Sequence, residues 1–456
     1  MDFSSRIERL ARSLGDIDVH TEPHYRIAYG YDATAVSGQC GGVAFPTCLD
    51  DLRRILDSSS KLGIPVFARG AGSGFSGGAV PLGGGLAVST EKLARVLRLD
   101  EEAYEVEVEC GLVNKDLQDL LEKSSLFYPP DPASFRFSTI GGNIAENAGG
   151  PRAFKYGVTR RYVRSLTWLT CSGDVVTGIH GGPGSLLTGS EGTLGVIYSA
   201  RLSLLPKPEA FRTLLLEAGG GGDAMGVAAE LISVGFCPSV LEYIDAKTIA
   251  CVNEFKVLRG LNKDVSCLFI EIDGTLSEVR AQYSLLDDFC RKRGLDRIVA
   301  WNDAEREAIW ELRRSISPSL ARKGITKVNE DISLPLGRLA EAVPFIHDLA
   351  KGLYLDCYVF GHCGDGNLHV NIMTDRRKKE EMKRAERFVE RLFARVVEMG
   401  GTLSGEHGIG TTKAPYLSML FSPEELALQR RIKEAMDPLG LLNPGKYMTW
   451  NRDSGH

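Results

Sequence analysis

Two histidines, His362 and His369, lie on either side of an Asp-Gly pair in the segment CYVFGHCGDGNLHVNIM. If Asp365-Gly366 forms the two-residue loop of a type I′ hairpin, where both central residues need positive φ, His362 pairs with His369. Opposed residues on one sheet face have Cβ atoms about 4.5–5.5 Å apart, so the two imidazoles could reach one ion. Asn371 joins the same face because side chains alternate with period two. The hairpin alone is equally compatible with two hydrogen-bonded histidines in ordinary strands.

A carboxylate that could complete such a site follows in the segment GGTLSGEHGIGTTKAPYL, residues 400–417. Glu406 and His407 are adjacent there, in a turn flanked by glycines. Two histidines plus one carboxylate is the ligand set of an open catalytic zinc site, which leaves positions for substrate and solvent. We therefore predict a divalent-metal site made of His362, His369 and Glu406, with Zn²⁺ favoured and Mn²⁺ or Fe²⁺ as alternatives.

The first half of the chain contains three glycine-rich segments that could position a large ligand. The first, ARGAGSGFSGG, follows a predicted strand at residues 64–68 and contains G-x-G-x-x-G. A Rossmann loop must open into a helix, but Pro81 and the glycines at 83–85 intervene, and residues 86–88 predict another strand. Successive backbone N–H groups in a glycine turn can bind phosphate without a helix. A plain glycine-rich hairpin is the alternative.

Two further glycine-rich segments follow, YPPDPASFRFSTIGGNIAENAGGPRAFKYGV and LLTGSEGTLGVIYSARLSLLP. The first has a stiff, proline-rich entry and then supplies backbone amides and asparagine side chains. The second ends in an apolar strand. Because ordinary helix and strand patterns separate the three segments, together they could wrap one extended cofactor.

Beyond residue 210 the pattern changes to strands that alternate with amphipathic helices. Residues 266–272 predict a strand. Residues 378–399 predict the clearest helix, because its apolar residues share one stripe that Gly400-Gly401 ends. Near the N-terminus, Leu10, Leu14 and Ile17 predict a short amphipathic helix.

Length and composition limit the class of protein. A chain of 456 residues suggests two or three domains, and a net charge of −5 provides no basic surface for nucleic acid. The ten cysteines show no C-x-x-C spacing, which indicates a reducing compartment and no locally held iron–sulfur cluster. The sequence lacks both an apolar run of about 18 residues and the apolar segment of a secretory signal. We therefore expect a cytoplasmic protein without a membrane span.

The order of the motifs resembles the FAD domain of the vanillyl-alcohol-oxidase superfamily (PCMH-type FAD-binding). The resemblance runs from about residue 25 to residue 448. It is greatest for the group containing glycolate oxidase flavin subunits, D-lactate dehydrogenases and D-2-hydroxyglutarate dehydrogenases. It implies an α+β fold with a two-subdomain FAD-binding domain at residues 1–210 and an antiparallel-sheet α+β substrate cap at 211–400. A C-terminal segment, residues 401–456, would carry Glu406 and His407 and pack back on the FAD domain.

The resemblance also implies which residues bind FAD. None of residues 69–78 is His or Cys, so non-covalent FAD is expected. Asn443 could reach the isoalloxazine or could belong to a simple turn fixed by Pro444-Gly445. The pyrophosphate would lie at Arg69, Gly70, Ala71, Gly72, Ser73, Gly74 and Gly77, and the remaining contacts would be Pro130, Asp131, Thr139, Gly142, Asn143, Gly149, Tyr156, Glu191, Gly195 and Ile197.

On the substrate side, the resemblance makes His407 the catalytic base and Arg313 the residue that binds the substrate carboxylate. Arg313 suits that role because its planar fork pairs with two oxygens. Ser317 lies one helical turn further on, and Asn371 on the metal face is a further candidate. The family's lysine does not align, since Asn329 stands two positions before Asp331, and Lys327 is its candidate substitute. Lys413 could steer anions or face solvent.

Together these features predict an FAD- and metal-dependent D-2-hydroxy-acid dehydrogenase acting on a CH–OH group. The displaced lysine favours D-lactate or glycolate over 2-hydroxyglutarate, which is the alternative. A rival class, an FAD-binding electron-transfer subunit without its own chemistry, need not keep His362, His369, Glu406 and His407. A zinc hydrolase would leave the glycine segments without a role. Because the chain has no cluster motif, we expect a separate electron acceptor, either an iron–sulfur subunit or an electron-transferring flavoprotein.

Overall fold

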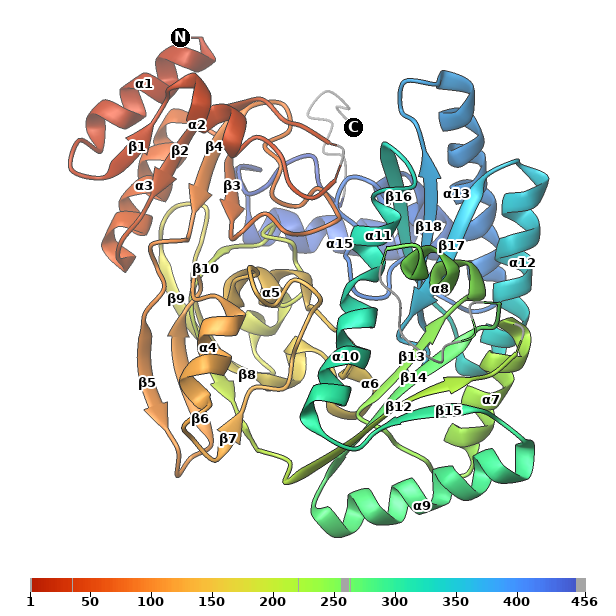
Figure 1. The fold of residues 1–456 in the computed structure, drawn as a ribbon. Coiled ribbons are helices and arrows are strands. Elements are labelled where there is room, and N and C mark those ends of the chain that lie inside the picture. The colour runs from red at the N-terminus through yellow and green to blue at the C-terminus, as the bar shows by residue number, and fades with distance from the viewer. Residues whose placement is uncertain (1, 35, 220, 256–261, 263, 448–456) are drawn as a thin grey trace. The chain divides into compact units, whose positions relative to one another are not determined.

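The computed structural model describes residues 2–34, 36–219, 221–255, 262 and 264–447 (Figure 1). Contacts divide the chain into two compact units. Unit 1 comprises Met1–Ala148, Val158–Pro206 and His407–His456, and unit 2 comprises Gly149–Gly157 and Lys207–Glu406. The division between units thus falls on the peptide bond that joins Glu406 to His407.

The first sheet of unit 1 has the strand order β1-β2-β4-β3, in which β1 is antiparallel and the other three strands are parallel. Its core is completed by α1 and α3, whose apolar faces are buried. The predicted N-terminal helix is present as α1 and carries Leu10, whereas Leu14 and Ile17 follow its end and are buried in the same core. The elements are α1 (Phe3–Ser13), β1 (Asp18–His20), α2 (Pro23–Ala28), β2 (Cys40–Phe45), α3 (Leu49–Leu62), β3 (Val66–Arg69) and β4 (Gly85–Ser89).

The glycine-rich stretch of this sheet joins β3 directly to the parallel strand β4. All of residues 70–84 are described, and none of them is helical. The prediction that this loop would not open into a Rossmann helix is confirmed.

The second sheet of unit 1 is antiparallel throughout, with the order β5-β6-β10-β8-β9. Buried residues of α4 and α5, such as Leu117 and Ile144, share one apolar core with it. The elements are β5 (Val96–Asp100), β6 (Glu105–Glu109), α4 (Asn114–Leu121), β7 (Leu126–Phe127), α5 (Ile140–Glu146), β8 (Val163–Leu169), β9 (Val175–Ile179), β10 (Val196–Ser203) and β11 (Leu205–Pro206), the last pairing with β7.

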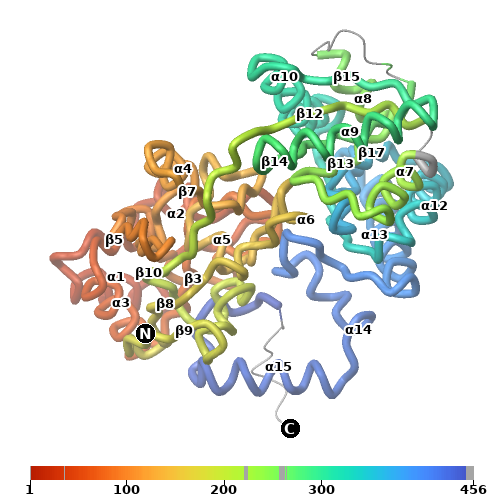
Figure 2. The backbone as a smooth tube through the Cα atoms, turned by 90° about the horizontal axis from the view of Figure 1, so that it is seen from below, coloured from red at the N-terminus to blue at the C-terminus, as the bar shows by residue number. Residues whose placement is uncertain are grey.

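The C-terminal part of unit 1 runs through α14 (Leu417–Leu420) and α15 (Pro423–Met436) and then returns to the first sheet (Figure 2). Val66 of β3 donates its N–H to the carbonyl of Leu441 and accepts the N–H of Asn443, each at 2.8 Å. The predicted C-terminal return segment is therefore present, and it adds to the edge of the sheet beside the glycine loop.

Unit 2 is built on one antiparallel sheet of seven strands, with the order β15-β12-β14-β13-β17-β18-β16. The predicted strand at 266–272 is β14 in this sheet. The strands are β12 (Ala210–Glu217), β13 (Val240–Ile244), β14 (Cys267–Gly274), β15 (Arg297–Ala300), β16 (Thr326–Ser333), β17 (Asp356–Gly361) and β18 (Asn367–Thr374).

Helices cover both faces of the seven-stranded sheet (Figure 1). On one face, α8, α10 and α11 bury an apolar cluster that includes Phe269, Trp310 and Phe360. The predicted helix at 378–399 is confirmed as α13, whose Phe388 and Leu392 are buried. The helices are α6 (Ala153–Tyr156), α7 (Gly221–Ser233), α8 (Ala246–Asn253), α9 (Leu276–Arg293), α10 (Asp303–Arg314), α11 (Ile316–Leu320), α12 (Leu339–Gly352) and α13 (Lys379–Glu398).

The structure bears on two features of the composition, the cysteines and the apolar segments. All ten cysteines are free thiols. Among the described residues, no helix combines the length and the apolar character needed to cross a bilayer.

Candidate active site

Three of the predicted residues converge in unit 2. The Nε2 atoms of His362 and His369 are 3.4 Å apart, and the Oε1 atom of Glu406 lies 3.1 Å from the first and 3.6 Å from the second. Both histidines are buried, and Glu406 is nearly so. The cluster therefore presents two imidazole nitrogens and one carboxylate oxygen toward a common point.

These distances fit a bound zinc ion. With Zn–N and Zn–O bonds of about 2.0–2.2 Å, neighbouring ligand atoms of a tetrahedral site are about 3.3–3.5 Å apart. The three separations in the cluster lie within a few tenths of an ångström of that value. The donor set is also that of an open site, because three protein ligands leave a fourth position for another oxygen.

The hairpin that carries the histidines has a different register from the predicted one. In the β17–β18 pair, Phe360 and not His362 lies opposite His369. The predicted two-residue loop at Asp365-Gly366 was wrong, because the strands already separate after Gly361. The register is shifted by two residues, so side-chain alternation leaves both histidines on the same side.

Two structural features accompany the early separation of the strands. A Cβ at Gly361 would lie 2.6 Å from the carbonyl oxygen of Asn367, so the chains cross closely there. Further along, the N–H of Gly364 donates to the carbonyl of Leu241 in β13 instead of to β18. The turn is thus shaped by a third strand, which the local sequence does not show.

A buried carboxylate, Glu242 of β13, joins two of the predicted residues. One oxygen contacts Nδ1 of His362, and the other accepts from Nε of Arg313 at 2.5 Å. Burial disfavours the ionised carboxylate, but Arg313 and His362 together lower the pKa of Glu242 to about 2. Burial likewise opposes protonation of His362, yet Glu242 and Glu406 raise the pKa of His362 well above its usual range.

The backbone that presents Glu406 is held by a second buried carboxylate. Asp331 of β16 accepts the N–H groups of Gly405 and Glu406 on Oδ2, at 2.8 and 2.6 Å. A Cβ at Gly405 would lie 2.3 Å from Nδ2 of Asn367, so a side chain there would push the turn away. Asp331 and Gly405 therefore fix the backbone from which Glu406 reaches the histidines.

The other candidate substrate residues of unit 2 lie on neighbouring elements. Nζ of Lys327 is 3.5 Å from Oγ of Ser317 in α11, and burial lowers the pKa of Lys327. Asn371 accepts from Nδ2 of Asn329 at 2.7 Å and donates to the carbonyl of His369. Lys327, the candidate substitute for the family's lysine, thus lies beside Ser317, the candidate residue one helical turn after Arg313.

In unit 1, the glycine loop after β3 allows close approach at several points. A Cβ at Gly70 would lie 2.3 Å from Oγ1 of Thr139, and Gly72 has a φ of +67°. The guanidinium of Arg69 is buried, and its Nη1 donates to the carbonyl of Tyr31 at 2.6 Å. The glycines therefore leave the backbone of this loop without side chains at those positions, which suits a pyrophosphate nest.

Two buried polar atoms beside this loop suit a cofactor. Nδ2 of Asn143 and Oδ1 of Asn443 have no hydrogen-bond partner among the described residues, although both side chains are buried. Unpaired buried polar atoms are rare and costly. Both are atoms that the polar groups of a flavin could satisfy, and both residues were predicted FAD contacts.

The loop that begins with His407 is fixed by Glu191. The carboxylate of Glu191 accepts the N–H groups of Ile409 and Gly410, each at 2.7 Å. Glu191 itself has a φ of +53°, and its carbonyl accepts from Nδ2 of Asn443 at 2.6 Å. Burial raises the pKa of Glu191, and the two N–H groups oppose that shift.

The same loop contacts the glycine loop. The rings of Phe75 and His407 are 5.1 Å apart, and the carbonyl of Ser76 accepts the N–H of Thr411 at 2.9 Å. Gly410, with a φ of +50°, leaves room for that contact, since a Cβ there would lie 1.9 Å from the Ser76 oxygen. The candidate base and the candidate pyrophosphate loop therefore pack as one assembly within unit 1.

Comparison with known proteins decides the family. The family described as "FAD linked oxidases, C-terminal domain" matches residues 207–447, and "FAD binding domain" matches residues 41–178. The chain belongs to the FAD-linked oxidases. It is 36% identical to "Glycolate oxidase subunit GlcD" of Bacillus subtilis over 92% of each chain. It is 31% identical to "D-lactate dehydrogenase" of Anaerostipes hadrus over 88% of each chain.

Solved structures agree on the fold of this FAD-linked oxidase. p-Cresol methylhydroxylase with substrate bound superposes with a TM-score of 0.81 at 16% identity, over 100% of this chain and 98% of the other. A 4-ethylphenol oxidase from Gulosibacter chungangensis gives 0.78 at 17% identity, over 99% and 98%. The predicted α+β, PCMH-type architecture is confirmed, and the protein is an FAD-linked oxidoreductase.

The remaining predicted FAD residues of this oxidase are distributed over both units. Gly149 and Tyr156 belong to unit 2, where the Tyr156 hydroxyl donates to Asp273 at 2.7 Å. Ile197 packs into the core of the second sheet, and a Cβ at Gly195 would meet Trp168 at 2.8 Å. Pro130 accepts from Asn114, and Thr139 caps α5 with its hydroxyl toward the N–H of Gly142.

Sequence reasoning missed Glu242 and did not assign a role to Asp331. The signal for Glu242 was present, because it is the only charged residue in the apolar strand Val240–Ile244. A fully buried carboxylate requires pairing. That pattern predicts a paired carboxylate but does not identify its partners, which come from α10 and from the turn after β17.

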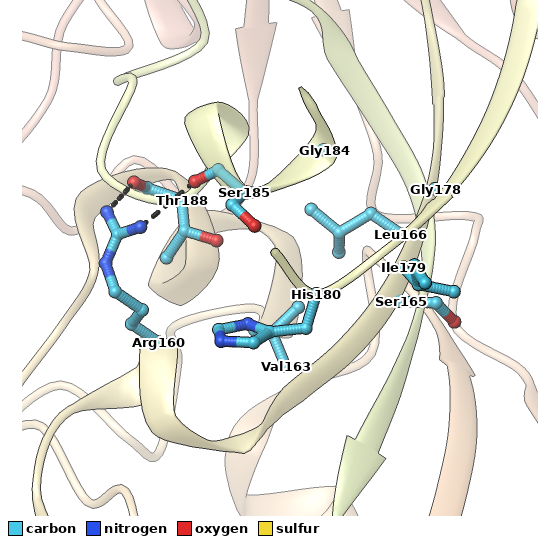
Figure 3. A pocket seen from close by; sticks show the side chains of 10 residues that line it. All are labelled: Arg160, Val163, Ser165, Leu166, Gly178, Ile179, His180, Gly184, Ser185 and Thr188. Atoms are coloured by element: carbon cyan, nitrogen blue, oxygen red, sulfur yellow. Dashed lines mark hydrogen bonds between the residues drawn. The ribbon is translucent and has the colours of Figure 1, made fainter. Parts of the chain in front are cut away.

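A small cavity lies in unit 1 (Figure 3). It is lined by Arg160, His180 and Ser185 among others, and its volume of about 10 Å³ holds one water at most. The guanidinium of Arg160 donates to the carbonyls of Ser185 and Thr188. The cavity is thus a packing feature of a loop that Arg160 closes.

Alanine substitutions at two glycines test whether the loop of His407 depends on its contact with the glycine loop. Gly410→Ala and Gly83→Ala both place a side chain at positive φ, which costs about 1–3 kcal/mol. Only Gly410→Ala also meets an atom, so we expect about 1–3 kcal/mol more loss of unfolding free energy. Urea denaturation measures both. Equal losses in the two variants would contradict the close contact.

Proposed function

We propose that this oxidase is an FAD- and divalent-metal-dependent D-2-hydroxy-acid dehydrogenase of the glycolate or D-lactate class. The observation that carries the proposal is the cluster of His362, His369 and Glu406, whose separations suit a metal ion, in a chain that belongs to the FAD-linked oxidases. Relatives named as a glycolate oxidase subunit and as a D-lactate dehydrogenase support the substrate class.

Different residues of the chain have different roles in this reaction. The guanidinium of Arg313 binds the substrate carboxylate through its Nη atoms, because its Nε is used by Glu242. His362, His369 and Glu406 would hold a divalent metal. His407 removes the hydroxyl proton as general base. A bound divalent metal would supply the Lewis acid that lowers the pKa of that hydroxyl, and FAD would supply, at N5, the acceptor for the hydride whose loss from C2 gives a 2-oxo acid.

Asn443, Asn143 and the glycine loop, residues 69–78, hold FAD without a covalent bond. A separate protein, either an iron–sulfur subunit or an electron-transferring flavoprotein, takes the electrons in the cytoplasm. The support for a partner is that the relative from Bacillus subtilis is named as a subunit. The sequence itself carries no cluster motif.

A substrate screen tests the proposed class. Glycolate, D-lactate, L-lactate and D-2-hydroxyglutarate are offered to the purified protein with an artificial dye as electron acceptor. We expect the highest kcat/KM for glycolate or D-lactate, because the lysine of the 2-hydroxyglutarate enzymes is displaced here to Lys327. A preference for D-2-hydroxyglutarate would refute the substrate class, and turnover of none would support an electron-transfer subunit.

Acid precipitation tests the mode of FAD attachment. Because residues 69–78 contain no His or Cys, the flavin is expected in the supernatant, where its absorbance can be measured. Yellow colour that stays in the washed pellet would show a covalent bond and contradict the proposal.

Alanine variants separate the metal ligands from the base. His362→Ala and His369→Ala should lose bound metal, measured by elemental analysis, and keep FAD. His407→Ala should keep metal and FAD, while flavin reduction by substrate slows by a factor of about 10²–10⁴, the usual cost of losing a general base.

A chelator provides the control for these variants. It should abolish flavin reduction in the wild type, and added Zn²⁺ or Mn²⁺ should restore it. Full metal content and activity in His362→Ala would show that the histidines are ordinary residues of the sheet.

A further inference from the structure

We propose that Glu242 is a positioning residue that orients the metal ligand His362 and the substrate arginine Arg313 at the same time. The inference rests on the proposed function, because it concerns the same site. It adds a residue that neither the sequence motifs nor the comparisons assign. Glu242 acts through its two partners and does not itself ligate the metal.

The position of Glu242 requires two strong partners. Its side chain is fully buried in the middle of β13, between strands β14 and β17 of the seven-stranded sheet. Desolvation would prevent an isolated carboxylate in such a place from staying ionised. Each of its oxygens has its own partner, His362 on Oε1 and Arg313 on Oε2. The carboxylate is therefore fixed in direction as well as in charge.

The contact with Nδ1 determines which ring nitrogen of His362 faces the metal ligands with its lone pair. An ionised carboxylate can only accept a hydrogen bond, so Nδ1 carries the proton that points at Glu242. In the neutral imidazole, Nε2 then has the lone pair. Nε2 is the atom that faces Glu406 and His369. Carboxylates in this position orient a metal-binding histidine and make it a better ligand.

The contact with Nε sets the direction of Arg313. The guanidinium is planar, so a bond at Nε fixes the plane in which both Nη atoms lie. The same group lies over the ring of Phe360, 5.0 Å from its centroid, which restricts rotation about the bond to Glu242. Arg313 consequently presents its Nη edge as a fork of defined direction.

The charge of Glu242 also allows a cation and an arginine to share the site. A divalent metal on His362 and the guanidinium of Arg313 would repel one another. Glu242 contacts both His362 and that guanidinium. A negative charge between two positive groups offsets that repulsion. Replacing Glu242 by neutral Gln removes the charge and keeps the shape.

Glu271 provides a matched control in the neighbouring strand β14. It is equally buried in the same sheet, and Arg306 binds its carboxylate with two hydrogen bonds of 2.8 Å. Trp310 and Thr213 donate to it as well, at 2.8 and 2.7 Å. None of these partners is a predicted metal ligand. Glu271→Gln therefore reproduces the loss of a buried charge without altering the contacts of His362.

The experiment measures Zn²⁺ affinity by competition with a chromophoric chelator, using the FAD-loaded full-length protein. We expect Glu242→Gln to weaken Zn²⁺ binding about 10–100-fold, the effect of losing such a carboxylate beside a metal ligand. FAD content should not change. Glu271→Gln should bind Zn²⁺ like the wild type. Unchanged affinity in a folded Glu242→Gln, or an equal loss in Glu271→Gln, would overturn the proposal.

A second variant keeps the test decisive if Glu242→Gln does not fold. Glu242→Asp retains the charge but is one methylene shorter, so it cannot reach both partners as Glu242 does. We expect weaker Zn²⁺ binding or a higher KM for D-lactate, and wild-type values of both would contradict the proposal. A wild-type protein that binds no Zn²⁺ would instead refute the metal-dependent function, which distinguishes the two failures.

Discussion

The segment Gly405–Gly410 is held by two buried carboxylates, each of which accepts two consecutive backbone N–H groups. Asp331 binds the amides of Gly405 and Glu406, and Glu191 binds those of Ile409 and Gly410. Hydrogen bonds to charged acceptors are stronger than neutral ones, and buried carboxylates need them. Asp331 thus fixes the backbone of the candidate metal ligand Glu406 in unit 2, and Glu191 fixes the loop that begins with the candidate base His407 in unit 1.

The anchors also explain why glycine recurs in this segment. The backbone at Gly408 and Gly410 has positive φ, and a Cβ at Gly405 or Gly410 would run into a neighbouring residue. The sequence predicted the glycine-flanked turn at Glu406-His407. It also predicted the helix at 378–399 and the absence of a Rossmann helix after β3. These features follow from local patterns, namely apolar periodicity and glycine spacing. Local patterns are the part of a structure that a single sequence expresses most directly.

The features that were predicted wrongly, incompletely or not at all share a different cause. The hairpin register was wrong by two residues because Gly364 pairs with Leu241, a residue more than a hundred positions away. Glu242 was missed because its partners come from α10 and from the turn after β17. The role of Lys327 could be stated only as a substitution, since the sequence does not show that its side chain reaches Ser317 of α11. In the first two cases contacts between residues distant in sequence override the local pattern.

The pair of anchors has a consequence for how this segment tolerates change in length. One additional residue within either anchored pair, Gly405-Glu406 or Ile409-Gly410, would bring about 3.3–3.6 Å of extra chain between two N–H groups that share one carboxylate. Surface loops usually accommodate insertions without loss. Here an insertion inside either pair would take one of the two N–H groups away from its carboxylate, Asp331 in unit 2 or Glu191 in unit 1. The spacing within each anchored pair is therefore constrained as strictly as the identity of its residues.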